Sequence, residues 1–227
     1  MRELGIEFIS VFGLPPVELV NLAADLGCQH ISTALVVRGL ESLGYPGFSL
    51  KDDVRLRRRL IAAMDDQGVS ISLGEGMVIT PGADVSDQAA DLDVMAELGA
   101  AQVNTLSFDP DRNRSFDQLA ILTQMATERG IGTTIEMAPG LTIGDLSAVT
   151  AAIEHVGASS LRLTVDTMHW VRTGYGAAEL RELGPEKIGY VQLSDTTLKP
   201  RMKSYLEEAM YERMAPGDGE LPLAAII

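Results

Sequence analysis

The sequence contains a single cysteine, Cys28, so it cannot form an internal disulfide bond. Small secreted domains commonly depend on such bonds, and nothing of that kind points to an oxidising compartment here. Cys28 follows Gly27 at the start of an apolar stretch, where a small buried side chain is the expected role and a reactive thiol is the minor alternative.

Basic residues and long apolar runs are also scarce. The 227 residues include 18 Lys and Arg against 32 Asp and Glu, for a formal net charge of −14. A surface of that charge repels nucleic acid and anionic membranes. No uncharged run approaches the roughly 18 residues of a membrane span, and the segment from Met1 to Gly5 has no apolar signal-peptide region. We therefore expect a cytoplasmic protein without nucleic-acid or membrane partners.

Hydrophobic residues make up 46% of the chain, enough for one substantial core, which predicts a single domain over residues 1–227. Strand-like and helix-like segments alternate along the chain, and this alternation predicts a parallel sheet covered by helices. The expected strands are 4–10, 28–33, 69–74, 101–106, 131–136, 161–166 and 187–193, and the expected helices are 15–26, 52–67, 84–98, 115–129, 142–155 and 175–183.

The first strand is not followed by a glycine-rich phosphate-binding motif, so a dinucleotide-binding open sheet lacks its main support. We predict a parallel (β/α)8 TIM barrel instead, of which seven strands are recognisable. Because the sequence ends on an apolar helix start, Leu221–Ile227, we expect the last strand and helix to lie beyond residue 227. An element supplied by a partner chain and an incomplete barrel are the alternatives. Residues 34–51, rich in glycine, predict a loop over the active face.

Three expected strands end in a residue with a side-chain oxygen, namely Glu136, Asp166 and Gln192. The intervals between them are 30 and 26 residues, about one strand-plus-helix unit each. Such spacing brings the three oxygens to one end of a parallel barrel, where these folds carry their chemistry. The pattern predicts a divalent metal site. A helix cap for Glu136 and a structural hydrogen bond for Gln192 are the competing interpretations.

A histidine follows the second of these acids. The sequence has three histidines, of which His30 lies at a strand start and His155 at a helix end before Gly157. Both positions have structural explanations. His169 lies three residues after Asp166 and is therefore the best candidate for an acid, a base or a substrate contact.

Four segments resemble the xylose isomerase-like TIM-barrel superfamily, whose members are often described as sugar phosphate isomerases or epimerases. They are Ile135-Glu136, Asp166-x-x-His169, Tyr190–Asp195 and Pro216–Glu220. The resemblance covers essentially the whole chain. It implies one divalent ion, commonly manganese, magnesium, cobalt or zinc, with Glu136, Asp166 and Gln192 as ligands and His169 beside the substrate. Many epimerases of the family have histidine at the position of Gln192, whereas glutamine resembles the 3-dehydroshikimate dehydratase branch. The family's fourth ligand, a glutamate of the eighth strand, would lie beyond residue 227.

This resemblance implies a metal-dependent isomerase or epimerase of a small sugar or polyhydroxylated carbonyl compound, acting through an enediolate with Glu136 and His169 as catalytic groups. A dehydratase of the 3-dehydroshikimate or inosose type is the first alternative, and a metal-free barrel that serves as a binding protein is the second. Related DNA-repair endonucleases share this barrel but need a basic face, which the charge of this chain disfavours. Glu75 is expected to contact substrate, and Lys199 and Arg201 could hold a carboxylate or phosphate or simply form a solvated helix start. Homodimers are expected because barrels of this group often pair.

Overall fold

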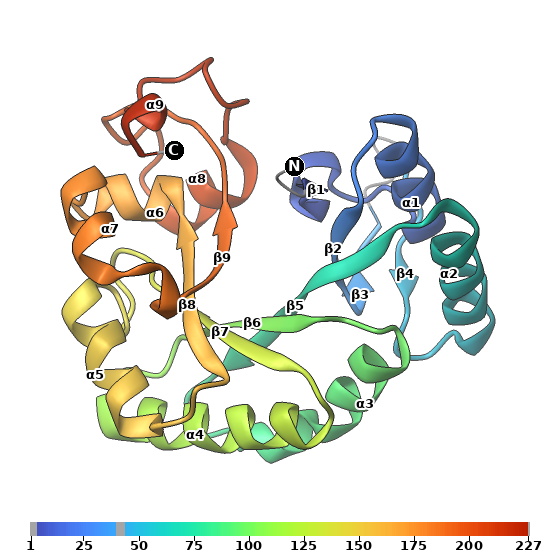
Figure 1. Ribbon diagram of the computed structural model, residues 1–227, viewed down its shortest axis with the longest axis horizontal. Helices are drawn as coiled ribbons and strands as arrows, with labels where there is room; N and C mark the ends of the chain where they lie inside the picture. Colours follow the sequence, from blue (N-terminus) through green and yellow to red (C-terminus); the bar gives the residue numbers. More distant parts are fainter. Residues whose placement is uncertain (1–3, 40–43, 227) are drawn as a thin grey trace. The chain divides into compact units, whose positions relative to one another are not determined.

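The computed structural model describes residues 4–39 and 44–226 (Figure 1). Within this part of the chain, seven strands form one sheet in the order β1-β2-β5-β6-β7-β8-β9, so that neighbours in the sheet follow one another along the chain. The pairs β1–β2, β2–β5, β7–β8 and β8–β9 are parallel. The strands are β1 (Gly5–Ile6), β2 (His30–Ala34), β5 (Ser70–Ile79), β6 (Gln102–Ser107), β7 (Gly132–Glu136), β8 (Leu161–Asp166) and β9 (Ile188–Gln192).

Helices follow the strands along the chain, as the sequence pattern predicts (Figure 1). They are α1 (Pro16–Asp25), α2 (Val54–Gln67), α3 (Ala89–Glu97), α4 (Arg112–Glu128), α5 (Leu146–Val156), α6 (Thr167–Arg172), α7 (Ala177–Leu183), α8 (Tyr205–Tyr211) and α9 (Leu223–Ile226). Short 3-10 helices lie at η1 (Phe8–Val11), η3 (Val85–Gln88) and η4 (Pro185–Lys187). None of the helices in the described ranges is long and apolar enough to cross a membrane.

The predicted strand 4–10 is wrong over most of its length. Only β1 forms there, and η1 follows it. The Ser32 hydroxyl donates to Glu7 Oε1 at 2.5 Å and accepts from the backbone N–H of Phe8 at 2.9 Å. These two bonds draw the chain out of the extended conformation after β1. Propensity within the segment could not reveal them, because Ser32 is distant in sequence.

The predicted loop 34–51 is partly ordered into a small antiparallel pair. It consists of β3 (Val36–Val37) and β4 (Phe48–Ser49). Residues 40–43 of this loop, like residues 1–3 and Ile227 of the two terminal segments considered above, lie outside the described residues. The helix expected over 142–155 begins later, at Leu146, because the Asp145 side chain accepts the backbone N–H of Ala148 and caps the helix.

The chain divides into two compact units, each assembled from separate stretches of sequence. The first is drawn from residues 1–77, 85–104 and 124–132. In this unit α1 packs against α2, and both helices bury apolar side chains such as Leu19 and Leu60. The buried Arg57 of α2 pairs with Glu97 at 2.9 Å and donates to the carbonyl oxygen of Leu50. Its charge and its donors are therefore satisfied within the unit.

The second unit is drawn from residues 78–84, 105–123 and 133–227, and it contains the buried cluster of Glu136, Asp166 and His169 described below. Ile135 of β7 lies opposite Leu163 of β8, and neither is exposed. At the end of β8, three residues beyond Leu163, Asp166 lies opposite Gln192 of β9. Because parallel strands end at the same edge of a sheet, this register brings the polar strand ends together.

Candidate active site

Two buried carboxylates terminate neighbouring strands. Glu136 is the last residue of β7 and Asp166 the last residue of β8, and their exposed fractions are 6% and 2%. Each follows a run of buried apolar or β-branched residues, which forces the strand and carries the acid into the interior. An ionised carboxylate at such depth needs a cation or several hydrogen bonds to compensate for lost hydration.

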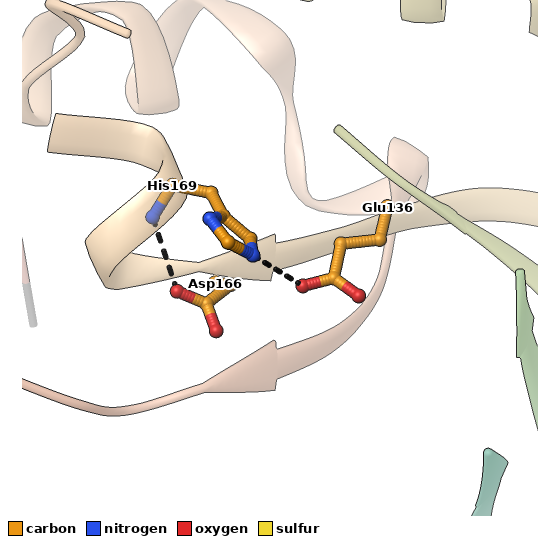
Figure 2. A group of neighbouring side chains, drawn as sticks. All are labelled: Glu136, Asp166 and His169. Atoms are coloured by element: carbon orange, nitrogen blue, oxygen red, sulfur yellow. Dashed lines mark hydrogen bonds and ion pairs between the residues drawn. The ribbon is translucent and has the colours of Figure 1, made fainter. Parts of the chain in front are cut away.

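Asp166 receives part of this compensation from the helix that it starts. Its Oδ1 atom accepts the backbone N–H groups of Met168 at 2.8 Å and His169 at 3.1 Å, so the carboxylate caps the N-terminus of α6. The cap fixes the direction of α6 and thereby the place of His169 within its first turn. Strand, cap and helix together explain the Asp166-x-x-His169 spacing (Figure 2).

The imidazole of His169 points toward Glu136, and His169 Nε2 lies 3.2 Å from Glu136 Oε1 (Figure 2). One potential ligand atom from each of Glu136, Asp166 and His169 lies within 4.8 Å of the others, and all three residues are buried. Two carboxylates and an imidazole are donors that zinc and other divalent transition ions accept. This donor set therefore fits a divalent ion.

The other ring nitrogen of His169 is engaged by the helix α8. Tyr205, the first residue of α8, forms a short hydrogen bond between its hydroxyl group and His169 Nδ1, and the two ring centroids are 5.5 Å apart. Burial raises the pKa of the Tyr205 hydroxyl, so this group remains protonated at neutral pH. The imidazole is thus held from both sides, by a carboxylate and by a phenol.

Arg213 supplies a cation to the second carboxylate. Its Nη1 atom donates to Asp166 Oδ2 at 2.6 Å and to Ser194 Oγ at 2.8 Å, and its Nε atom donates to the carbonyl oxygen of Ala209 at 2.6 Å. Burial by itself would raise the pKa of Asp166, but the charges of Arg213 and His169 hold it below the usual value. Burial opposes protonation of His169, but the attraction of Asp166 and Glu136 raises the pKa of that imidazole.

The position of Arg213 depends on a loop organised by Asp195. Asp195 Oδ2 accepts the backbone N–H of Gly217, and Oδ1 accepts that of Leu221. The backbone of Asp195 also exchanges hydrogen bonds with Met214, at 3.0 and 2.8 Å. This clamp holds the Pro216–Glu220 segment and, immediately before it, Arg213.

Gln192 and Glu75, two further residues predicted from the sequence, lie at strand positions. Gln192 ends β9 half-buried, and its Cα pairs with that of Asp166. Glu75 belongs to the first unit, where the buried Asn104 donates its Nδ2 to Glu75 Oε2 at 3.2 Å. Their predicted roles in metal and substrate binding stay predictions.

Lys199 and Arg201, the predicted anion-binding residues, are in the segment between β9 and α8. Arg201 pairs with Glu212 at 3.3 Å, and about half of its side chain is exposed. Lys199 is exposed, and its carbonyl oxygen accepts a hydrogen bond from Arg172 at 3.3 Å. The predicted contact of these two residues with a substrate carboxylate or phosphate stays a prediction.

Sequence reasoning gave no role to Tyr205 or Arg213, the two residues that complete the cluster. They are 36 positions from His169 and 47 from Asp166, respectively. A signal for Arg213 was present, since it stands three residues before Pro216-Gly217-Asp218-Gly219. For Tyr205 the sequence offers only a weak indication of a role, namely its place as the first residue of a helix capped by Ser204.

Comparisons with solved structures identify the same architecture. The chain is 17% identical to the IolI protein with a bound zinc atom, with a TM-score of 0.79 over 99% of this chain and 82% of that one. It is 15% identical to D-allulose 3-epimerase from Methylomonas sp., with a TM-score of 0.71 over 99% of this chain and 78% of that one. It is 14% identical to the probable 3-DHS dehydratase AsbF from Bacillus anthracis, with a TM-score of 0.70 over 86% and 74%.

These identities are low enough that the likenesses establish the fold alone. A xylose isomerase-like TIM barrel/4-hydroxyphenylpyruvate dioxygenase fusion protein is 22% identical, with a TM-score of 0.77, and the chain spans 99% of its own length but only 36% of that protein. No curated protein matches the chain. The family model described as xylose isomerase-like TIM barrel matches residues 20–227. The predicted fold class and superfamily are thereby confirmed, and the chain belongs to the xylose isomerase-like TIM-barrel family.

Proposed function

We propose that this chain is an isomerase or epimerase that moves a proton next to the carbonyl group of a small sugar or other polyhydroxylated compound. The observation that carries the proposal is the buried contact of 3.2 Å between Glu136 Oε1 and His169 Nε2, with the Asp166 carboxylate beside it. A carboxylate and an imidazole held together away from water are the groups that such proton transfer requires. The fold it shares with D-allulose 3-epimerase supports this class of reaction.

A divalent ion is part of the proposal. Glu136 and Asp166 would hold it through carboxylate oxygens, and Gln192 is the third candidate ligand because it lies opposite Asp166 at the end of β9. When bound, the ion would act as a Lewis acid on the substrate carbonyl and stabilise the negative charge that develops on its oxygen. The zinc atom bound to IolI supports a metal of this kind, and manganese, magnesium and cobalt are the other candidates.

The side chains of Glu136, His169 and Asp166 have separate roles in the reaction. Glu136 accepts the proton from the carbon next to the carbonyl. In an isomerisation it returns this proton to the former carbonyl carbon, and in an epimerisation a second acid supplies a proton from the opposite face. His169, oriented by Tyr205 at Nδ1, donates to a substrate oxygen through Nε2, the nitrogen that otherwise contacts Glu136. Asp166 keeps α6 in place through its two backbone hydrogen bonds, so that the imidazole remains aligned with Glu136. Because all three are buried, these interactions act in a medium of low dielectric constant, where each is stronger than in water.

A dehydratase of the 3-dehydroshikimate or inosose type is the second candidate. In that reaction the same proton is removed, but the electron pair then expels the hydroxyl group of the neighbouring carbon. The leaving oxygen takes up a proton from His169 and departs as water, which leaves a conjugated double bond. Gln192 favours this candidate, since it stands where many epimerases of the family have histidine. The fold shared with the probable 3-DHS dehydratase also supports it.

One experiment in deuterated water separates the two reactions. The full chain, supplied with Mn²⁺, is incubated with a panel of ketoses, inososes and 3-dehydroshikimate. Proton NMR then measures exchange of the hydrogen next to the carbonyl, and ultraviolet absorbance measures any conjugated product. We expect exchange by the wild type and a loss of about 100-fold or more in Glu136→Gln, the range for removal of a general base. Exchange without absorbance indicates epimerisation, and absorbance indicates dehydration.

A matched control is Glu182→Gln, which makes the same substitution at an exposed position of α7 and should leave the rate unchanged. Equal rates in wild type and Glu136→Gln would contradict the assignment of the base. No turnover of any compound, with or without metal, would favour the alternative of a binding protein.

A further inference from the structure

The Arg213 guanidinium donates a hydrogen bond to Asp166 Oδ2, the oxygen of that carboxylate that does not cap α6. We propose that Arg213 competes with a divalent ion for Asp166, that its side chain withdraws from Asp166 when an ion binds there, and that it thereby sets the affinity of the site for the ion. This inference rests on the proposed function, because it takes Asp166 as a metal ligand.

Both oxygens of Asp166 accept hydrogen bonds from the protein. Oδ1 accepts the two backbone N–H groups that begin α6, and these cannot leave without unwinding the helix. Oδ2 accepts Arg213 Nη1 at 2.6 Å. A ligand oxygen lies about 2.0–2.2 Å from zinc, so an ion on Oδ2 would compete directly with the guanidinium for the same atom.

Charge repulsion strengthens this competition. The Asp166 side chain is 1% exposed and that of Arg213 is 19% exposed, so little water separates the charges. A divalent ion beside a monovalent guanidinium would be strongly repelled in such surroundings. Arg213 at Asp166 therefore opposes binding of the ion.

Two further hydrogen-bond acceptors keep Arg213 close to Asp166. Ser194 Oγ accepts the same Nη1 atom, and the carbonyl oxygen of Ala209 accepts Nε. The backbone next to it, at Met214, is fixed by its two hydrogen bonds with Asp195. Displacement must consequently occur by rotation of the long side chain, while the backbone stays in place.

Binding of Mn²⁺ to the full, chelator-treated chain tests the inference, with the electron paramagnetic resonance signal of free Mn²⁺ as the readout. We expect Arg213→Gln to lower the Kd for Mn²⁺ about tenfold or more, because an apparent affinity falls with the fraction of sites that is competent to bind. Arg213→Lys retains a cation and should have an intermediate Kd. Arg57→Gln removes a buried, paired arginine from the first unit and should leave the Kd unchanged.

Ser194→Ala provides a second variant should Arg213→Gln fail to fold, as judged by circular dichroism. It removes only one of the acceptors that hold the guanidinium, and a decrease in Kd of a few fold is expected. An equal or higher Kd in the variants, with Mn²⁺ bound by the wild type, would overturn the inference and leave the metal assignment intact. If neither the wild type nor any variant binds Mn²⁺, both the inference about Arg213 and the metal assignment are overturned.

Discussion

The ion pair between Arg172 and Glu208 fastens the segment that carries Tyr205 and Arg213. Arg172 Nη2 lies 2.6 Å from Glu208 Oε1, and the two side chains are 6% and 0% exposed. Glu208 Oε2 also accepts the backbone N–H groups of Arg201 and Met202, at 3.2 and 3.4 Å. One buried carboxylate thus joins α6, α8 and the chain between them.

Replacement of Glu208 by glutamine should lower the free energy of unfolding by about 3–5 kcal/mol, the usual cost of removing one partner of a buried ion pair. The substitution conserves volume but leaves the Arg172 charge uncompensated. Within the described structure, Arg172 Nε and Nη1 are buried and already have no hydrogen-bond partner, so few groups remain to absorb the loss. Urea denaturation followed by far-ultraviolet circular dichroism measures the difference.

Glu212→Gln is the matched control. It breaks the pair with Arg201, whose side chains are 47% and 40% exposed, and should cost no more than about 1 kcal/mol. The double variant Arg172→Met with Glu208→Leu should lose less than Glu208→Gln alone, because neither charge then remains buried. If Glu208→Gln and Glu212→Gln lower the free energy of unfolding by the same amount, burial does not determine how much the Arg172–Glu208 pair stabilises the fold, and the reasoning fails.

Two further predictions concern the chain around Asp195 and its response to pH. Gly219→Ala would place a Cβ against the Asp195 carboxylate and 2.6 Å from the carbonyl oxygen of Thr196. The free energy of unfolding, measured by urea denaturation, should fall by about 1–3 kcal/mol. An unchanged urea midpoint would refute the close approach. Burial raises the pKa values of Asp195 and Glu208, but backbone N–H donors, and Arg172 for Glu208, hold them below the ordinary 3.8 and 4.5. The stabilisation by these two carboxylates is therefore present above about pH 4.5 and is lost as the pH falls through their lowered pKa values. Glu208→Gln should consequently make the urea midpoint fall less steeply with decreasing pH. The same fall in the variant and the wild type would contradict this.

Much of the fold was predictable because local and global signals agree. The predicted strands 131–136 and 161–166 match β7 and β8 to within one residue, since β-branched and apolar runs are bounded there by glycine or by loop residues. The strand predicted over 69–74 continues as β5 to Ile79. Gly76, with φ of 95°, lies inside β5. In the sequence alone a glycine at this place indicates the end of a strand, which is why the predicted strand is too short.

The sequence could predict that site residues lie close together only where the order of strands and helices determines their positions. Glu136 and Asp166 end adjacent parallel strands, and His169 follows Asp166 by one helical turn, so their meeting follows from the order of elements. The contacts of Tyr205 and Arg213 depend on the path of residues 194–219, which the Asp195 clamp decides. Tertiary hydrogen bonds of this kind leave no periodic pattern in a sequence.

Anomalous X-ray diffraction at the zinc edge, from crystals of the full chain grown with ZnCl₂, tests the central claim most directly. We predict one peak about 2.0–2.2 Å from a carboxylate oxygen of Glu136 and one of Asp166, with Arg213 Nη1 withdrawn from Asp166 Oδ2. Glu136→Gln crystals should lack the peak. A wild-type map with no peak between these two carboxylates, at a zinc concentration that saturates other surface sites, would contradict the account.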